Sequence, residues 1–253
     1  MLEIDEISKT IGTKTVLDRI TLSISSGASL AIVGESGSGK STLARIVMAL
    51  ERPTSGVIRF NGIAAPHKKT SDFKDWYRQI QFVFQNTTAS LDPRMTIAQS
   101  LEEPLTGFTG MGKNERKERI AEYAEKVGLP PHLLAERPGR LSGGQYQRAC
   151  IAKALVVKPK LLICDEIVSN LDLLHQHQII ELLHTLKIEQ QLSLLFITHD
   201  LSLLAGLCEE IAVLKEGQLV ERFASSAIHA SGHHPYTQSL LNAARSLGRR
   251  ASE

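Results

Sequence analysis

Short aliphatic runs alternate with segments of helical period along much of the chain. Three of these runs are continuously apolar over four residues, which is typical of strands buried on both faces of a parallel sheet. They occupy residues 30–33, 161–164 and 194–197. In the intervening segments the apolar residues recur every three or four positions, as in amphipathic helices. This alternation predicts an α/β layer architecture with a mostly parallel central sheet.

Two other parts of the chain follow different patterns. Residues 1–25 and 57–61 have the pattern of strands linked by turns, which predicts an antiparallel β edge. Between residues 86 and 158 helical patterns replace strand patterns. This stretch is therefore expected to form a helical subdomain inserted into the α/β core.

One helix of this subdomain is predicted over residues 113–127. Its apolar positions recur at i, i+3, i+4 and i+7, which places them on one face. They are Ile120, Tyr123, Ala124 and Val127. Gly128 follows directly and is suited to end the helix.

Together these patterns predict a single domain, for which 253 residues are enough. The α/β core with its β edge is expected over residues 1–85 and 159–225, and the helical subdomain over residues 86–158. Residues 226–253 are polar and are expected to form a loosely packed C-terminal appendage.

Composition narrows the class of protein. The chain is 42% hydrophobic and 22% charged, as ordinary soluble proteins are, and no apolar run approaches the roughly 18 residues that cross a bilayer. The N-terminus lacks the basic and apolar segments of a secretory signal, so we expect a cytoplasmic protein that reaches a membrane only through a partner. The three cysteines form no C-x-x-C pair and are expected to be buried thiols without a disulfide. A net charge of +2 spread along the chain gives no reason to expect a nucleic acid partner.

Residues 34–42 lie between a predicted strand and a predicted helix and have the form G-x-x-x-x-G-K-[ST] of a phosphate-binding loop. Glycines allow backbone N–H groups to face an anion, and the N-terminus of the next helix adds its positive dipole end. Lys40 is predicted to contact the β- and γ-phosphates of ATP, and the Ser41 hydroxyl to ligate Mg²⁺. The predicted nucleotide-binding residues of the loop are Gly34, Glu35, Ser36, Gly37, Ser38, Gly39, Lys40, Ser41 and Thr42. The helix that follows is predicted to bury an apolar face formed by Leu43, Ile46, Val47 and Leu50.

Two further strand ends carry candidate catalytic groups. Asp165 and Glu166 follow the strand over residues 161–164; we predict that Asp165 holds Mg²⁺ through water and that Glu166 orients or deprotonates the attacking water. Without a phosphate loop, two such acids would be an ordinary polar strand end. His199 follows the strand over residues 194–197 and is predicted to sense the γ-phosphate, although a lone histidine is more often structural.

The segment Leu141-Ser142-Gly143-Gly144-Gln145 does not belong to kinases or small GTPases, and with the motifs above it resembles the signature of ABC ATPases. The resemblance covers nearly the whole chain. It implies a P-loop NTPase core with a mostly parallel central sheet, an antiparallel β edge and an inserted helical subdomain. In that family two subunits meet head to tail, so each ATP lies between the phosphate loop of one subunit and the signature of the other. The signature residues would therefore contact nucleotide held by the partner, and Ser142 can also cap a helix whose first N–H groups face an anion.

The same resemblance assigns further roles. Gln85 matches the family's glutamine that links metal and water to the membrane partner, and residues 169–172 match the loop that communicates across the dimer. The helical subdomain is where family members dock a coupling helix of the permease. The family usually has an aromatic residue near position 11 that stacks on adenine. Here Ile11 offers only apolar contact with the base, so we expect somewhat weaker or less base-selective binding.

Residues 88–96 and 234–237 are similar to the peptide and nickel importer branch of the family. This implies a sister ATPase in a heterodimer or a homodimer, two integral membrane permease subunits and an extracytoplasmic substrate-binding protein, at the cytoplasmic face of the inner membrane. Ile167 and Asn170 replace a more usual proline and alanine, which is closer to the second ATPase of nickel or metal-chelate importers. We therefore expect nickel or a metal–metallophore complex as cargo, with oligopeptides or dipeptides as the alternative. Four histidines are expected to be solvated and not metal ligands, namely His175, His177, His233 and His234.

Two other classes of protein compete with this interpretation. An ABC ATPase that works on ribosomes or DNA without a permease usually has two cassettes or a long coiled-coil insertion, and this sequence has neither. A P-loop kinase of small molecules would not need residues 141–145, and it would hydrolyse ATP poorly without an acceptor.

Overall fold

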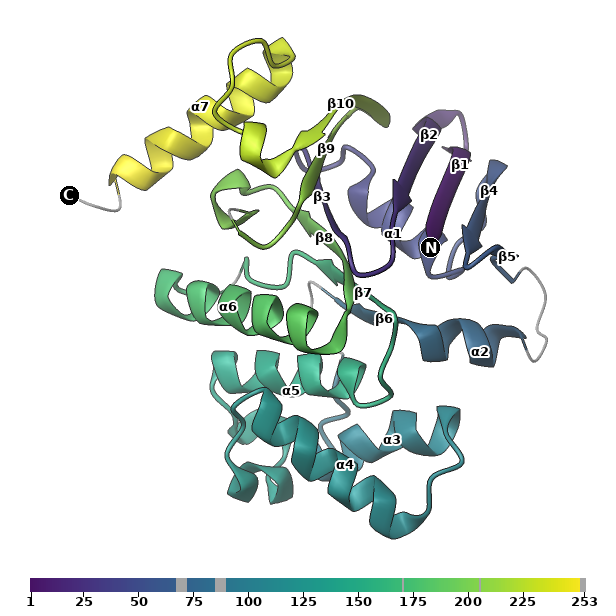
Figure 1. Ribbon diagram of the computed structural model, residues 1–253, viewed down its shortest axis with the longest axis vertical. Helices are drawn as coiled ribbons and strands as arrows, with labels where there is room; N and C mark the ends of the chain where they lie inside the picture. The colour runs from purple at the N-terminus through teal and green to yellow at the C-terminus, as the bar shows by residue number, and fades with distance from the viewer. Residues whose placement is uncertain (67–71, 85–89, 170, 205, 251–253) are drawn as a thin grey trace. The chain divides into compact units, whose positions relative to one another are not determined.

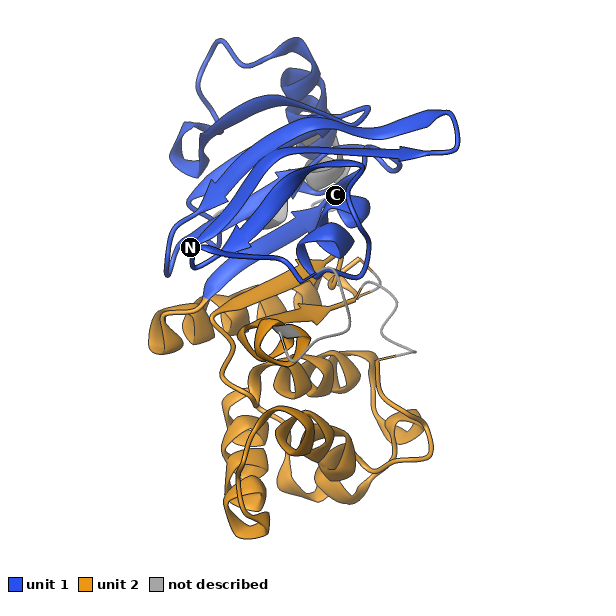
Figure 2. Cartoon of the chain, turned by 90° about the vertical axis from the view of Figure 1, so that its right-hand side faces the viewer, with its two compact units in different colours: residues 1–68, 193–253 blue, residues 69–192 orange. Residues whose placement is uncertain are grey.

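The computed structural model describes the backbone of most of the chain, namely residues 1–66, 72–84, 90–169, 171–204 and 206–250 (Figure 1). It forms two compact units, shown in different colours in Figure 2. Unit 1 consists of residues 1–68 and 193–253, and unit 2 of residues 69–192.

Unit 1 contains an antiparallel sheet with the strand order β2-β1-β4-β5. Its strands are β1 (Leu2–Ile11), β2 (Lys14–Ile24), β4 (Ser55–Phe60) and β5 (Ile63–Ala64). In β1 the side chains of Leu2 and Ile4 are buried while those of Glu3 and Asp5 are exposed. This period of two is what one buried face of a sheet requires. The predicted antiparallel β edge is confirmed.

The second sheet of unit 1 has the order β10-β9-β3-β8 within the unit. Its strands are β3 (Ser29–Val33), β8 (Ser193–Thr198), β9 (Glu210–Lys215) and β10 (Gln218–Ala224). β3 pairs in parallel with both β8 and β9, and every residue of β3 and β8 is buried. Continuous burial is the reason that these strands are apolar runs without alternation.

Helix α1 (Lys40–Val47) follows β3 and buries three of the four predicted apolar residues, Leu43, Ile46 and Val47. The prediction was wrong for Leu50, whose side chain is 50% exposed. The helix ends at Val47, and Ala49 has a left-handed φ of 55°, so the chain turns before Leu50 can join the helical face.

The C-terminal part of unit 1 contains the short 3-10 helices η4 (Leu201–Leu204) and η5 (Ser225–Ala227) and the helix α7 (Pro235–Arg250). The prediction of a loosely packed appendage was wrong for the start of this segment. His233 is 8% exposed, Tyr236 9%, and Thr237 is fully buried. The prediction that His233 is solvated was therefore also wrong, because its ring lies 4.4 Å from that of Phe223 and is enclosed.

Unit 2 has two parallel strands and five α-helices among its described residues. β6 (Ile80–Val83) pairs with β7 (Leu161–Asp165), so that Val83 lies opposite Cys164. The α-helices are α2 (Asp72–Gln79), α3 (Ile97–Phe108), α4 (Lys113–Lys126), α5 (Gly143–Leu155) and α6 (Leu173–Gln190). Two 3-10 helices precede α5, η2 (Pro131–Ala135) and η3 (Pro138–Arg140). Three of the helices, α3 to α5, lie within the predicted helical subdomain, whose exact boundaries remain a prediction.

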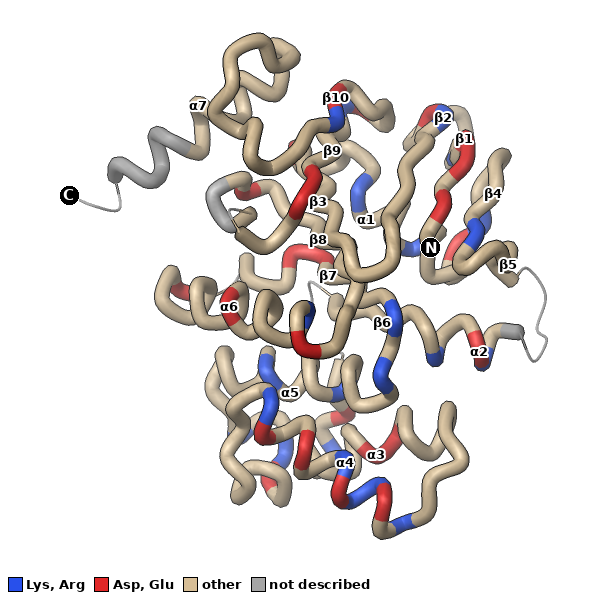
Figure 3. Tube along the Cα trace, in the orientation of Figure 1, with Lys and Arg blue, Asp and Glu red and all other residues tan. Residues whose placement is uncertain are grey.

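Helix α4 confirms the helix predicted over residues 113–127. The four predicted apolar residues are at most 5% exposed, and Gly128 adopts the left-handed φ of 66° that ends many helices. The remaining faces carry charges of both signs, as Figure 3 shows along the tube of α4. Glu122 pairs with Lys126 at 2.7 Å and with Arg119 at 3.2 Å, and all three residues are half-buried.

The predicted burial of Cys150, Cys164 and Cys208 is confirmed. Within the described ranges of the chain, no helix is both long and apolar enough to span a bilayer.

Candidate functional site

The predicted phosphate loop connects the end of β3 to the start of α1, as a phosphate loop requires. At two positions the backbone admits only glycine. Gly34 has a φ of 154°, and a Cβ atom there would lie 2.1 Å from the carbonyl oxygen of Leu214. Gly39 has a φ of 103°, and its Cβ would lie 2.8 Å from the carbonyl oxygen of Val16. The spacing of these glycines in the motif thus follows from close backbone packing at both ends of the loop.

Lys40 folds back over this loop and is 4% exposed. Its ammonium group donates hydrogen bonds to the carbonyl oxygens of Gly34 at 2.7 Å and Glu35 at 2.8 Å. Because residues 35–37 are exposed, an anion can approach the loop from that side. The positive charge of Lys40 therefore lies inside the loop that would hold the phosphates.

Two hydrogen bonds join the backbone of the loop to residues outside it, one to backbone and one to a side chain. The N–H of Gly217, between β9 and β10, donates to the carbonyl oxygen of Ser38 at 3.1 Å. The N–H of Glu35 donates to the hydroxyl oxygen of Tyr236 at 3.0 Å. The sequence pattern indicated neither contact, because both partners lie far along the chain from the loop.

His199 lies at the same edge of the sheet as the phosphate loop. The parallel register places Val33 of β3 opposite Thr198 of β8, so the residues that follow them, Gly34 and His199, leave the sheet side by side. His199 is exposed there. Carboxyl ends of neighbouring parallel strands are where α/β proteins bind ligands. Unit 1 therefore brings the phosphate loop and the predicted γ-phosphate sensor together.

Ile11 is the last residue of β1 and its side chain is 56% exposed. Gly12, with a φ of 59°, begins the turn into β2. The side chain is thus free of the core, and its contact with a nucleotide base remains a prediction.

In unit 2 the two predicted acids follow one another at the end of β7. Asp165 is 6% exposed, and Glu166 has a left-handed φ of 47°. The carbonyl oxygen of Glu166 accepts hydrogen bonds from the N–H of Ser169 at 3.3 Å and from its hydroxyl at 3.0 Å. These bonds stabilise the turn that follows β7 at Glu166. Gln85 lies outside the described residues, just beyond β6. The approach of both acids to the phosphate loop remains a prediction from the sequence.

The predicted signature begins α5. The hydroxyl oxygen of Ser142 accepts a hydrogen bond from the N–H of Gln145 at 3.3 Å, and the Gln145 side-chain oxygen accepts one from the N–H of Ser142 at 3.0 Å. This is a capping box at the start of α5, where Gly143 is exposed and Gly144 is buried. The helix start predicted at Ser142 is confirmed, and its geometry suits an anion.

Residues 171–175, at the start of α6, meet the signature within unit 2. Asp172 caps α6 by accepting from the N–H of His175 at 3.0 Å, and it also pairs with His175 Nδ1 at 2.7 Å. These bonds lower the pKa of the Asp172 carboxyl, first through the His175 N–H. The His175 ring in turn lies against Gly144. His175 was expected to be a solvated side chain; its ring connects two predicted functional segments, a contact that no local pattern reveals.

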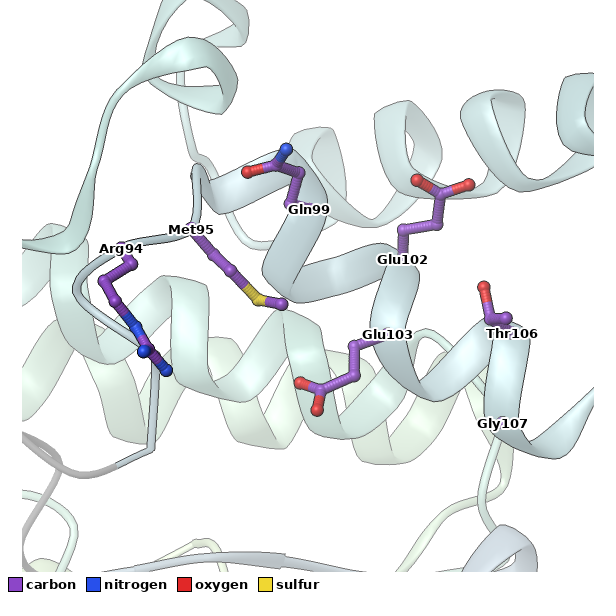
Figure 4. A pocket seen from close by; sticks show the side chains of 7 residues that line it. All are labelled: Arg94, Met95, Gln99, Glu102, Glu103, Thr106 and Gly107. Atoms are coloured by element: carbon purple, nitrogen blue, oxygen red, sulfur yellow. The ribbon is translucent and has the colours of Figure 1, made fainter.

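Unit 2 also has a surface pocket of about 620 Å³ on α3 and the loop before it (Figure 4). Its lining includes Arg94, Met95, Gln99, Glu102, Glu103 and Thr106. The charged groups are paired at its rim: Glu102 with Arg116 and Glu103 with Lys153, each at 2.9 Å. The pattern of the sequence located the helical subdomain but not this hollow.

Comparisons with known proteins agree with this fold. The sequence model of the ABC transporter family matches residues 17–169. The chain therefore belongs to the ABC transporter family, and it is one of the family's ATPases. The predicted P-loop NTPase fold is confirmed.

Two relatives illustrate its position within the family. The nickel import ATP-binding protein NikE of Brucella suis biovar 1 (strain 1330) is 42% identical over 91% of this chain and 86% of that protein. A probable peptide ABC transporter ATP-binding protein, y4tS of Sinorhizobium fredii (strain NBRC 101917 / NGR234), is 40% identical over 90% of this chain and 65% of that protein.

Solved structures give the same result. The dimeric structure of the bacterial ABC transporter cassette MJ0796 has a TM-score of 0.80 at 31% identity, covering 89% of this chain and 99% of that chain. The same cassette has been solved as a post-hydrolysis dimer bound to ADP and Pi, at 30% identity with the same TM-score and coverage. CbiO1 from Clostridium perfringens, described as part of the ABC transporter complex cbiONQ, has a TM-score of 0.83 at 26% identity over 91% of this chain and 90% of that chain.

Proposed function

We propose that the chain is the ATP-hydrolysing subunit of an importer for nickel or a metal–metallophore complex. The observation that carries the ATPase role is the phosphate loop itself, with Lys40 folded over it and His199 at the same sheet edge. An oligopeptide or dipeptide importer is the alternative, because relatives of both names have nearly the same identity to this chain.

One feature favours the metal cargo. Ile167 and Asn170 stand where the branch more usually has proline and alanine, and this resembles the second ATPase of nickel or metal-chelate importers. The feature concerns the class of ATPase, since the ATPase itself need not touch the cargo.

We propose Ser41, Gln85 and Asp165 as the groups that hold Mg²⁺, Asp165 through water. When bound, this ion neutralises charge on the β- and γ-phosphates. Among the residues that the structure describes, no group of three histidine, cysteine or acidic side chains forms a metal cage. The donor set fits Mg²⁺ in a phosphate loop, which takes one hydroxyl from the protein and completes its coordination with phosphate oxygens and water.

The remaining residues have separate tasks in this proposal. The loop N–H groups and the N-terminus of α1 bind the phosphates, and Lys40 adds a point charge. Glu166 orients or deprotonates the attacking water, and His199 stabilises charge on the γ-phosphate. The first-turn N–H groups of α5 that follow Ser142 would complete the site of a partner subunit. Each subunit then contributes its phosphate loop to one ATP site and its signature to the other, so hydrolysis requires a dimer. The dimeric cassette MJ0796 supports this arrangement.

The partners follow from this role. We propose a sister ATPase, in a heterodimer or a homodimer, two integral membrane permease subunits and an extracytoplasmic substrate-binding protein, with the chain bound at the cytoplasmic face of the inner membrane. The pocket on α3 lies in the region where a permease loop is expected to dock. A pocket of this size suits a few side chains of a short helix.

The test is reconstitution with the ATPase and permease encoded beside this chain, in proteoliposomes that also receive the binding protein. Hydrolysis of Mg·ATP is recorded with nickel chelates and with short peptides, and Lys40→Ala serves as the inactive control. Stimulation by a nickel chelate supports the proposal. Stimulation by peptides alone rejects the metal cargo, and no stimulation by either with a permease present favours an ABC ATPase that works without one.

A further inference from the structure

Residues 234–237 resemble an importer branch, yet in the structure one of them, Tyr236, contacts the phosphate loop. Tyr236 lies in the first turn of α7 and is 9% exposed. Its hydroxyl oxygen accepts the hydrogen bond from the N–H of Glu35 at 3.0 Å. Glu35 is the second residue of the loop, between Gly34 and the exposed residues 36–37. The contact therefore fixes one peptide unit of the loop that binds phosphate.

The tyrosine ring is itself held in place. Lys215 at the end of β9 places its ammonium nitrogen 5.2 Å from the ring centroid, within the range of a cation–π contact. The N–H of Tyr236 donates to His234 Nδ1 at 3.2 Å. Burial raises the pKa of the Tyr236 hydroxyl, so it stays protonated and can accept a hydrogen bond without adding negative charge beside the loop.

A second contact fixes the start of α7 to β10. His233 Nδ1 donates to the carboxylate of Glu221 at 2.8 Å, and its Nε2 lies 2.9 Å from the carbonyl oxygen of Ala227. The other carboxylate oxygen of Glu221 accepts from the N–H of His234 at 3.0 Å. The segment that presents Tyr236 is thus attached to the sheet independently of the phosphate loop.

We propose that Tyr236 is a positioning residue for nucleotide binding, which holds the Glu35 peptide so that the loop is ordered before a nucleotide arrives. A loop held in its binding geometry does not lose conformational entropy when the ligand binds. The role requires only the nucleotide binding of an ABC ATPase and is independent of the cargo. It assigns residues 234–237 to the ATP site, where the sequence connected them with the type of importer.

The variant Tyr236→Phe tests this role, because it removes the accepting oxygen and leaves the ring. The dissociation constants of ADP and of Mg·ATP are measured by calorimetry on the full chain. Both are expected to rise about 3- to 10-fold, the equivalent of one hydrogen bond. The turnover rate at saturating Mg·ATP is expected to stay within about twofold of wild type, since groups that act on the γ-phosphate are unchanged.

Tyr123→Phe is the matched control. Tyr123 is a fully buried tyrosine of α4, and its hydroxyl donates to the side-chain oxygen of Gln190 at 3.0 Å, away from any predicted site residue. This variant is expected to keep wild-type nucleotide affinity. Amide hydrogen exchange of the nucleotide-free proteins gives a second readout, in which the Glu35 amide exchanges faster in Tyr236→Phe and at the wild-type rate in Tyr123→Phe.

Two results would overturn the proposal. One is wild-type affinity for both nucleotides in Tyr236→Phe together with unchanged exchange at Glu35. The other is an equal loss of affinity in Tyr123→Phe, which would attribute the effect to general destabilisation. Neither result depends on a permease or a cargo, so this proposal and the proposed import function can fail separately.

Discussion

The imidazole ring of His175 lies against Gly144, so closely that a Cβ atom at position 144 would come within 2.7 Å of His175 Cδ2. The ring is also bonded to Asp172, which caps α6. The first turn of α5, which carries the signature, therefore packs directly against the first turn of α6 through Gly144 and His175. A change at Gly144 must displace His175 or lengthen its bond to Asp172.

This contact predicts the effect of Gly144→Ala on stability. Alanine in a helix is favoured over glycine by about 1 kcal/mol, so without His175 the change would stabilise the protein. With His175 present we expect a net loss of about 1–2 kcal/mol from overpacking. Urea unfolding of the two single variants and of Gly144→Ala with His175→Ala completes a double-mutant cycle.

Gly143→Ala is the control for that cycle, since the nearest heavy atom to a Cβ there, Leu171 Cδ2, lies at an ordinary 3.6 Å. It is expected to be neutral or stabilising. Equal effects of Gly144→Ala in the presence and absence of the His175 ring would contradict the contact.

Gly34→Ala is expected to be among the most damaging small substitutions in the chain. Its Cβ would overlap the carbonyl oxygen of Leu214, and the φ of 154° adds backbone strain. We expect a loss of about 3 kcal/mol or more in the free energy of unfolding, measured in urea. Gly62→Ala is the control for left-handed strain alone, because Gly62 has a φ of 78° and open space around it. A loss for Gly34→Ala no larger than for Gly62→Ala would refute the close packing.

Glu166→Gln is expected to abolish turnover while nucleotide still binds. The amide cannot accept a proton from water, so the hydrolysis rate should fall by about 100-fold or more. The variant is expected to accumulate as an ATP-loaded dimer, detected by size-exclusion chromatography with light scattering in Mg·ATP. Lys40→Ala is the complementary variant and should lose nucleotide affinity itself. Full turnover in Glu166→Gln would overturn the role of Glu166.

The pair of His233 and Glu221 predicts a dependence of stability on pH. The hydrogen bond to Glu221 raises the pKa of His233, and the carbonyl of Ala227 contributes further. The only other described ring in contact with it, that of Phe223, carries no charge. Because the pKa of His233 is raised in the folded state, the charged histidine stabilises the fold fully below its unfolded-state pKa of about 6.5. This stabilisation is lost as the pH rises through the folded-state pKa.

Urea unfolding of wild type and His233→Gln at several pH values checks this prediction. The free energy of unfolding of the wild type should exceed that of the variant most at about pH 6. This difference should shrink as the pH rises past the pKa of His233 in the folded protein. His132→Gln, at an exposed position in η2, controls for the loss of a histidine. A difference that grows with pH would show that His233 is neutral in the folded protein.

The sequence determined those features that depend on neighbours along the chain. A strand whose residues are all apolar can bury all of its side chains only inside a sheet that is covered on both faces. The strands β3, β7 and β8 were therefore predictable from the sequence. The phosphate loop and the helix α4 follow from glycine spacing and a helical period, which are local properties of the backbone. The signature cap at Ser142 is also local, because donor and acceptor are three residues apart.

The tertiary structure alone decided which distant segments meet. Tyr236 and Glu35 are 201 residues apart, and only the pairing of β9 with β3 and the fold of the C-terminal segment bring them together. His175 has no periodic signal, since its side chain is 43% exposed and its ring also contacts Gly144 on another helix. The side chain of Leu50 is exposed because the chain turns at Ala49, and a helical period in the sequence does not predict this turn. For Tyr236 and His175 the deciding contact joins residues that no sequence period relates, so it exists only once the chain has folded.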